Sequence, residues 1–179
     1  STSGTTGTPK LVSYNITSLM KTSKKDVTKG AHFRWGLCYD LNRFAGLQVY
    51  LQAIASGSPL TITESSDELT DIVKLFVDKN VTCMSATPSF WRKVLMTKGS
   101  ERLELKRITL GGEISDQTVL SSLKKHYARS HIVHIYASTE AGVGFSVKDG
   151  LEGFPADFIG PSKLSSVELK IADSILWIK

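Results

Sequence analysis

The first ten residues carry the side chains that most clearly suit the binding of a ligand. Five hydroxyl groups occur within the first six residues, and two glycines and a lysine complete the segment. Glycines let successive backbone N–H groups turn toward one point, while hydroxyls and an ammonium add donors and a compact positive charge. The segment suits an anion cradle, although it lacks the GxxxxGK(S/T) spacing of a Walker A loop. A flexible Ser/Thr/Gly-rich terminus without a ligand is the competing interpretation. The candidate cradle consists of Thr2, Ser3, Gly4, Thr5, Thr6, Gly7 and Lys10.

A second candidate site is the loop Gly111-Gly112-Glu113, which directly follows a predicted buried strand at 107–110. In open α/β sheets, ligands bind in the crevice at the carboxyl ends of the strands, so the loop lies where a ligand is expected to bind. A tight turn that ends in a helix-capping carboxylate would have the same sequence.

A third candidate follows the predicted strand 132–136 and combines an aromatic ring, hydroxyls and a carboxylate. It consists of Tyr136, Ala137, Ser138, Thr139 and Glu140. These groups could stack on a base, bond a phosphate oxygen and hold Mg²⁺, a cation that prefers oxygen ligands and bridges to phosphates. A helix start that is capped by Ser138 or Thr139 is the competing interpretation.

Helical and extended periodicities alternate along the chain and must position these loops. The predicted strands span 33–37, 60–63, 81–86, 107–110 and 132–136. The predicted helices span 44–55, 67–78 with Ser66 as N-cap, and 115–127, and another helix begins at Pro88. This order predicts an α/β fold of βαβ units, with a largely parallel sheet flanked by helices. Alternating apolar residues at 167–171, followed by 175–178, predict a C-terminal antiparallel hairpin, and 150–160 is the longest predicted loop.

The composition excludes several classes of protein. The 179 residues are 41% hydrophobic and 22% charged, which argues against disorder and against a fibrous protein. Cys38 and Cys83 form no CxxC pair, so neither a disulfide framework nor a zinc site is expected, and the protein is predicted to be cytoplasmic. No apolar run is long enough to span a membrane. The net charge of +5 is spread along the chain, and the scattered tryptophans offer no stacking platform, so nucleic acid is not an expected partner.

Together, the three candidate sites resemble the adenylate-forming enzymes, the AMP-binding superfamily of acyl-CoA synthetases, aryl-CoA ligases, luciferases and peptide-synthetase adenylation domains. The segment 2–10 matches the phosphate loop of that family at essentially every position. The segment 136–140 matches its Tyr-Gly-x-Thr-Glu motif, with Ala137 where glycine is usual. The segment 111–113 lies about twenty-five residues earlier, where the family places its adenine-side loop. The hairpin at 167–178 looks like the one that precedes the Thr-Gly-Asp motif of the family. Because the chain opens in a loop and ends in a strand, the resemblance implies that 1–179 is a partial adenylation domain. That part would be the central subdomain, without the N-terminal region and the small C-terminal domain.

The resemblance also implies roles for the motif residues. The loop 2–10 would hold the β- and γ-phosphates of ATP, and 111–113 would line the adenine and part of the acyl pocket, with Gly112 near the substrate. Tyr136 would stack on the adenine, Thr139 would bond the α-phosphate, and Glu140 would bind Mg²⁺. Ala137 and Ser138 would border the nucleotide. Lys10, Thr139 and Glu140 are thus the implied catalytic residues of a reaction in which a carboxylic acid attacks ATP. The acyl-adenylate formed then passes its acyl group to a thiol, usually that of coenzyme A.

The chain departs from the family where an aromatic-His pair is common before the helix at 44–55. Asn42 and Arg43 stand there instead. The fork of Arg43 could bind a second carboxylate or another polar group of the substrate. A surface arginine that pairs with Asp40 is the competing interpretation. Phe90 and Trp91 are assigned to core packing rather than to a border of the acyl pocket.

Three alternatives to a coenzyme A ligase remain at this stage. An adenylation domain that loads a carrier protein would share all of these loops. A non-catalytic nucleotide-binding module would not need to keep Lys10, Thr139 and Glu140, and a nucleic-acid-binding domain rests on charge alone. Without the rest of the family's catalytic machinery, the 179-residue chain by itself is expected to be inactive in adenylate formation.

Overall fold

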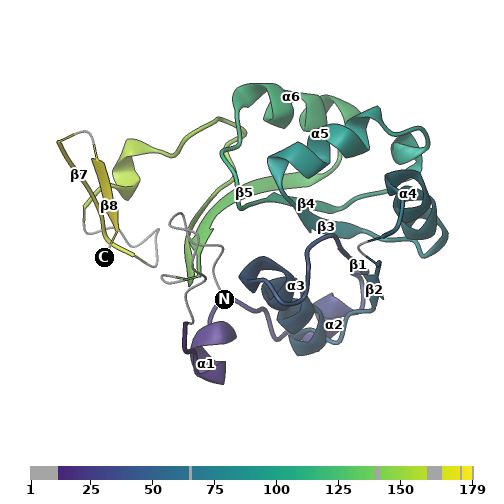
Figure 1. Ribbon diagram of the computed structural model, residues 1–179, viewed down its shortest axis with the longest axis horizontal. Coiled ribbons are helices and arrows are strands. Elements are labelled where there is room, and N and C mark those ends of the chain that lie inside the picture. The colour runs from purple at the N-terminus through teal and green to yellow at the C-terminus, as the bar shows by residue number, and fades with distance from the viewer. Residues whose placement is uncertain (1–11, 65, 140–141, 161–166, 174, 179) are drawn as a thin grey trace.

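A six-stranded sheet forms the centre of the molecule. The computed structural model describes residues 12–64, 66–139, 142–160, 167–173 and 175–178, so 2–10 and Glu140 lie outside the described residues. The strand order is β2-β1-β3-β4-β5-β6, in which the first five strands are parallel and β6 is antiparallel (Figure 1). The strands are β1 (Trp35–Leu37), β2 (Leu60–Ile62), β3 (Cys83–Ala86), β4 (Arg107–Leu110), β5 (His131–Ser138) and β6 (Gly142–Val147). The predicted α/β fold with a largely parallel sheet is confirmed.

Helices cover both faces of the sheet, but unequally. The helices α4 (Leu69–Asp78), α5 (Pro88–Met96) and α6 (Gln117–His126) lie on one face (Figure 1). The other face carries α3 (Phe44–Ala55), with the short helices α1 (Ile16–Leu19) and α2 (Val27–Gly30) beside it. The larger core cluster, which includes Phe76, Trp91, Ile108 and Leu123, lies between the sheet and the first group of helices. None of the helices in the described ranges is long and apolar enough to cross a membrane.

Two predicted helix starts are wrong by about two residues. α4 begins at Leu69 after Glu68 rather than after Ser66, and no side chain caps it. α6 begins at Gln117 instead of Ser115, because the carboxylate of Asp116 accepts a hydrogen bond from the backbone N–H of Val119. A carboxylate at the N-cap satisfies an otherwise unpaired N–H and favours the positive end of the helix dipole, so it fixes the start of α6.

The chain does not form a helix after β5, so the competing interpretation of Ser138 or Thr139 as a helix cap is wrong. β5 continues to Ser138, and β6 returns antiparallel to it, with a register irregularity between Tyr136 and Ala137. β6 was not predicted, although the alternation of Val143, Phe145 and Val147 is a signal for a strand with one buried face.

The C-terminal hairpin is confirmed as a separate two-stranded sheet. It consists of β7 (Leu169–Ala172) and β8 (Ile175–Ile178), which pair antiparallel. Leu169 joins Phe145, Val147 and Phe158 in a small core cluster, which attaches the hairpin to β6. The predicted long loop at 150–160 includes one short 3-10 helix, Ala156–Phe158.

Candidate functional site

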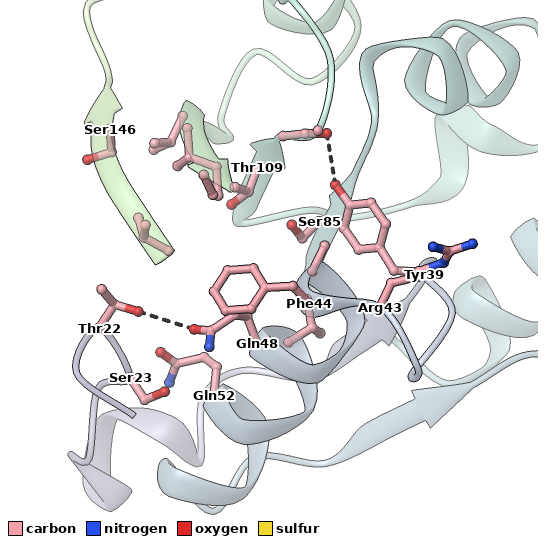
Figure 2. Close-up of a pocket in the computed structure, with 18 of the residues that line it drawn as sticks. Thr22, Ser23, Tyr39, Arg43, Phe44, Gln48, Gln52, Ser85, Thr109 and Ser146 are labelled. Carbon is pink, nitrogen blue, oxygen red and sulfur yellow. Dashed lines mark hydrogen bonds between the residues drawn. The ribbon is translucent and has the colours of Figure 1, made fainter. Parts of the chain in front are cut away.

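A cavity of about 840 Å³ lies on the face of the sheet that α3 covers only in part. α3 packs over β1 and β3, where Val49 and Ala53 contact a cluster with Trp35, Leu37 and Cys83. The adjoining part of this face, on β4, β5 and β6, forms the floor of the cavity (Figure 2). Six residues predicted from the sequence line this one cavity: Arg43, Gly111, Gly112, Ala137, Ser138 and Thr139.

The wall opposite the sheet consists of the segment 21–24, which two glutamine side chains of α3 hold in place. Gln48 accepts a hydrogen bond from Thr22 Oγ1 at 3.3 Å and donates one to a backbone carbonyl in α1 at 2.9 Å. Gln52 both accepts from and donates to the backbone of Lys24, at 2.9 and 3.1 Å. The glutamines thus fix the width of the cavity (Figure 2). Neither glutamine was predicted as a site residue, although 48 and 52 are four residues apart and therefore share a helix face.

A close approach of α3 to the preceding loop positions the residues at its N-terminus. A Cβ on Gly46 would lie 2.2 Å from the carbonyl oxygen of Asp40, so only glycine fits there. Phe44, two residues earlier, lines the cavity beside Tyr39 (Figure 2). The Gly46 contact therefore sets where these two rings lie.

Tyr39 joins this loop to the glycine pair after β4. Its hydroxyl donates to the carbonyl oxygen of Gly111 at 3.2 Å, as Figure 2 shows. Burial raises the pKa of Tyr39 above its usual value, so the hydroxyl stays protonated as a donor. Gly112 has a φ of 84°, which glycine adopts without strain. The predicted loop 111–112 therefore has a fixed conformation at the rim of the cavity.

The side chain of Glu113 contacts α5 and does not line the cavity. Its Oε2 accepts a hydrogen bond from the backbone N–H of Ser89 at 2.9 Å, in the first turn of α5. A hydrogen bond with the Ser89 side chain is the largest cause that holds the pKa of Glu113 below its usual range, and the Ser89 backbone adds to it. The structure thus shows the helix-capping carboxylate of the competing interpretation, but the helix is α5 and not the following α6.

Replacing Glu113 with glutamine is expected to lower the free energy of unfolding by about 0.5–1 kcal/mol at pH 7, because the exposed cap loses its charge. The folded-state pKa lies below the unfolded value of about 4.3, so the stabilisation is present above pH ~4.3 and is lost as the pH falls through the folded pKa. Urea unfolding of wild type and Glu113→Gln at pH 7 and pH 3 measures both effects. Glu104→Gln, an exposed site, is the control. A difference that is equally large at pH 3 would contradict this assignment.

Tyr136 does not line the cavity with its neighbours. Its ring stacks on Phe145, with centroids 5.4 Å apart and an interplanar angle of 12°, and it is 37% exposed. The register irregularity after Tyr136 separates it from Ala137, which does line the cavity. Stacking on an adenine would use the ring face that Phe145 leaves open.

Arg43 lies at the N-cap of α3 and is exposed, and it borders the cavity. Throughout the described ranges, no ion pair joins it to Asp40; the Asp40 carboxylate instead accepts from the backbone and side chain of Asn42, at 2.8 and 3.0 Å. The competing interpretation, a pairing of Arg43 with Asp40, is thus not observed, and the guanidinium lies beside Tyr39 (Figure 2).

The cavity is electropositive. Its lining includes four cationic side chains, Lys21, Lys24, Arg43 and Arg107, and no carboxylate from the part of the chain that is described. The described residues also hold no cluster of three His, Cys, Asp or Glu side chains that could bind a metal ion. The predicted Mg²⁺ ligand, Glu140, lies outside these residues. The described geometry therefore favours an anionic occupant.

Comparison with known proteins gives a consistent family relationship. The family model described as AMP-binding enzyme matches residues 2–175. Among solved structures, the N-terminal subdomain of NpsA from Klebsiella oxytoca, in complex with 3-hydroxybenzoyl-AMSN, has a TM-score of 0.74 and 18% identity. The alignment covers 94% of this chain and 44% of that one. A search of curated proteins found no match.

Two further structures share the fold. A variant of E. coli MenE with bound OSB-AMS has a TM-score of 0.63 and 19% identity, covering 84% of this chain and 31% of that one. The N-terminal domain of FACL13 from Mycobacterium tuberculosis has a TM-score of 0.62 and 18% identity, covering 81% of this chain and 38% of that one. The chain therefore spans less than half the length of the structures it matches.

Proposed function

Since the chain belongs to the AMP-binding enzyme family, we propose that it is part of an enzyme that activates a carboxylic acid with ATP. In this proposal, 1–179 is the central part of the adenylation domain of a longer protein. The carboxylate attacks the α-phosphorus of ATP, and an acyl-adenylate and pyrophosphate form. The acyl group then passes to a thiol.

One observation carries the proposal. The loops at 111–112 and 137–139, which are far apart in the sequence, line a single electropositive cavity together with Arg43. A carboxylate and a triphosphate repel each other, so their reaction requires positioning and charge neutralisation more than a protein nucleophile. A cavity with cations and hydroxyl donors, and without carboxylates from the described residues, supplies both.

The proposed roles follow from this arrangement. Lys10 and the hydroxyls of 2–8 hold the outer phosphates, Thr139 binds the α-phosphate, and Glu140 binds Mg²⁺, which would neutralise phosphate charge. Gly111 and Gly112 bring backbone close to the nucleotide and the acid. We also propose that Tyr136 stacks on the adenine and that Glu113 acts through the loop geometry that its cap on α5 maintains.

Coenzyme A is the proposed thiol acceptor, and the phosphopantetheine of a carrier protein is the alternative. We place the reaction in the cytoplasm. Two free cysteines, Cys38 and Cys83, agree with a reducing compartment. Burial raises the pKa of Cys38 to about 12 and that of Cys83 to about 11, so both thiols are protonated at neutral pH and neither competes with the acceptor thiol.

The test is pyrophosphate release by the full-length protein with a panel of carboxylic acids, ATP and Mg²⁺. We expect release with a subset of acids, and formation of the thioester when coenzyme A is added. A thioester that forms on a carrier protein and not on coenzyme A would support the alternative acceptor. The absence of acid-dependent release with every acid, in a protein that binds ATP, would contradict the proposed function and favour a non-catalytic nucleotide-binding module.

A further inference from the structure

Two buried hydrogen-bond donors in the cavity have no acceptor. They are Nε1 of Trp35 and Nε of Arg107, for which the described residues supply no partner. Trp35 is only 7% exposed, and both residues line the cavity. A buried N–H group without an acceptor is destabilising, so native proteins hold few of them and each calls for an explanation.

The two donors lie in one row across the sheet. Trp35 on β1 pairs with Cys83 on β3, and Cys83 pairs with Arg107 on β4. Paired residues on adjacent strands project to the same face, so Trp35 and Arg107 both lie on the α3 face. Their Cα atoms are two strand spacings apart, about 9.6 Å. The side chains of tryptophan and arginine are long enough for both to contact one small group that lies between them.

This row lies at the end of the cavity that is remote from the nucleotide loops. Arg107 begins β4, and Gly111 follows its last residue. Four residues of extended strand separate Arg107 from Gly111 by about 13 Å. Val133 and Ile135 on β5 line the space between the two ends. The cavity thus has an arginine at each end, Arg43 at the loop end and Arg107 at the other. Between them lie this apolar wall and the hydroxyls of Ser85 and Thr109.

We propose that Arg107 and Trp35 bind a second carboxylate, at the far end of the acid that is activated. The substrate would then be a dicarboxylic acid about ten carbon atoms long, counted with both carboxyl carbons, to match the ~13 Å between the two ends. A carboxylate supplies the acceptors that both N–H groups lack, and it neutralises the guanidinium. The assignment of the reacting carboxylate to the loop end depends on the proposed function; the recognition by Arg107 and Trp35 does not.

In this proposal, Arg43 and Arg107 bind different parts of the acid. Arg43 is exposed beside Tyr39, whose hydroxyl bonds the Gly111 loop. Arg107 is partly buried on the floor of the cavity, at the opposite end of β4 from that loop. Arg107 would therefore bind the distant second carboxylate, whereas Arg43 would bind groups near the reacting end of the acid.

The test compares decanedioate with decanoate, which share a chain length and differ in the second carboxylate. Their affinities for the full-length protein are measured by calorimetric or NMR titration at pH 7. We expect decanedioate to bind at least about tenfold more tightly, because charged hydrogen bonds are stronger than neutral ones. Arg107→Met is expected to abolish this preference while it changes the affinity for decanoate less than about twofold. Arg102→Met, an exposed arginine outside the cavity lining, is the matched control and is expected to keep the preference.

Equal affinities of the wild-type protein for the two acids, or a preference that persists in Arg107→Met, would overturn the proposal. Trp35→Phe decides the matter if Arg107→Met does not fold, because phenylalanine keeps a ring but removes the N–H group. We expect it to weaken decanedioate binding about threefold to tenfold and to leave decanoate binding unchanged; an unchanged preference would overturn the proposal. ATP binding is titrated separately. If the protein distinguishes the two acids but forms no adenylate, the proposed function is refuted, whereas the recognition by Arg107 and Trp35 is not.

Discussion

Replacing Trp91 with alanine is expected to lower the free energy of unfolding by about 3–5 kcal/mol, a large part of the stability of a domain of this size. Trp91 is fully buried at 0% exposure, between α5 and the sheet. Its Nε1 donates to the carbonyl oxygen of Thr109 on β4 at 3.1 Å, and its ring meets that of Tyr127 edge-on, with centroids 6.4 Å apart. Alanine would leave both a cavity and a carbonyl without its donor.

Urea unfolding followed by circular dichroism measures this loss. Trp91→Phe retains most of the ring volume and is expected to lose about 1–2 kcal/mol, since the hydrogen bond to Thr109 disappears. Met96→Ala, at the exposed end of the same helix, is expected to change stability by less than about 0.5 kcal/mol. A small effect of Trp91→Ala would show that α5 does not anchor the sheet. Trp91 lies in the core and not in the cavity lining, which confirms its assignment to core packing.

Removing the charge of Lys10 is expected to slow adenylate formation by the full-length protein about 10²–10³-fold. Losing one preorganised group that stabilises charge in a transition state has an effect of this size in other enzymes. In the proposed mechanism, Lys10 neutralises the phosphates that leave as pyrophosphate, so Lys10→Ala lowers kcat more than it raises KM for the acid. Glu140→Gln is expected to give a similar loss and to raise the Mg²⁺ concentration that half-maximal activity requires.

Pyrophosphate release at varied ATP, acid and Mg²⁺ concentrations separates these effects. Lys98→Ala, an exposed lysine in the loop after α5, is the control and is expected to retain the wild-type rate. Activity of Lys10→Ala within about threefold of wild type would contradict a role of Lys10 in charge neutralisation. A loss in Glu140→Gln that no Mg²⁺ concentration changes would contradict its role as a metal ligand.

The sequence predicted the elements well because their signals are local. The helix at 44–55 and the strand at 107–110 have the bounds that were predicted, and Pro88 is the first residue of α5 as expected. Errors occurred where two adjacent residues could both cap a helix, as at Ser115 and Asp116, and at the strand β6, which was not predicted. The start of α6 is decided by the hydrogen bond from the Val119 N–H to the Asp116 carboxylate, and β6 is formed by its antiparallel pairing with β5.

The type of fold, the order of most of its elements and the three segments that resemble the family could be predicted from the amino-acid order, because periodicity and motif order are properties of neighbouring residues. The directions of the side chains, in contrast, depend on how distant elements pack together. Glu113 caps α5, the ring of Tyr136 stacks on Phe145, and Trp35 and Arg107 share one cavity. The last two residues are 72 positions apart, and only the parallel register of β1, β3 and β4 places them in one row. Register depends on burial across the whole sheet, so no short segment encodes it.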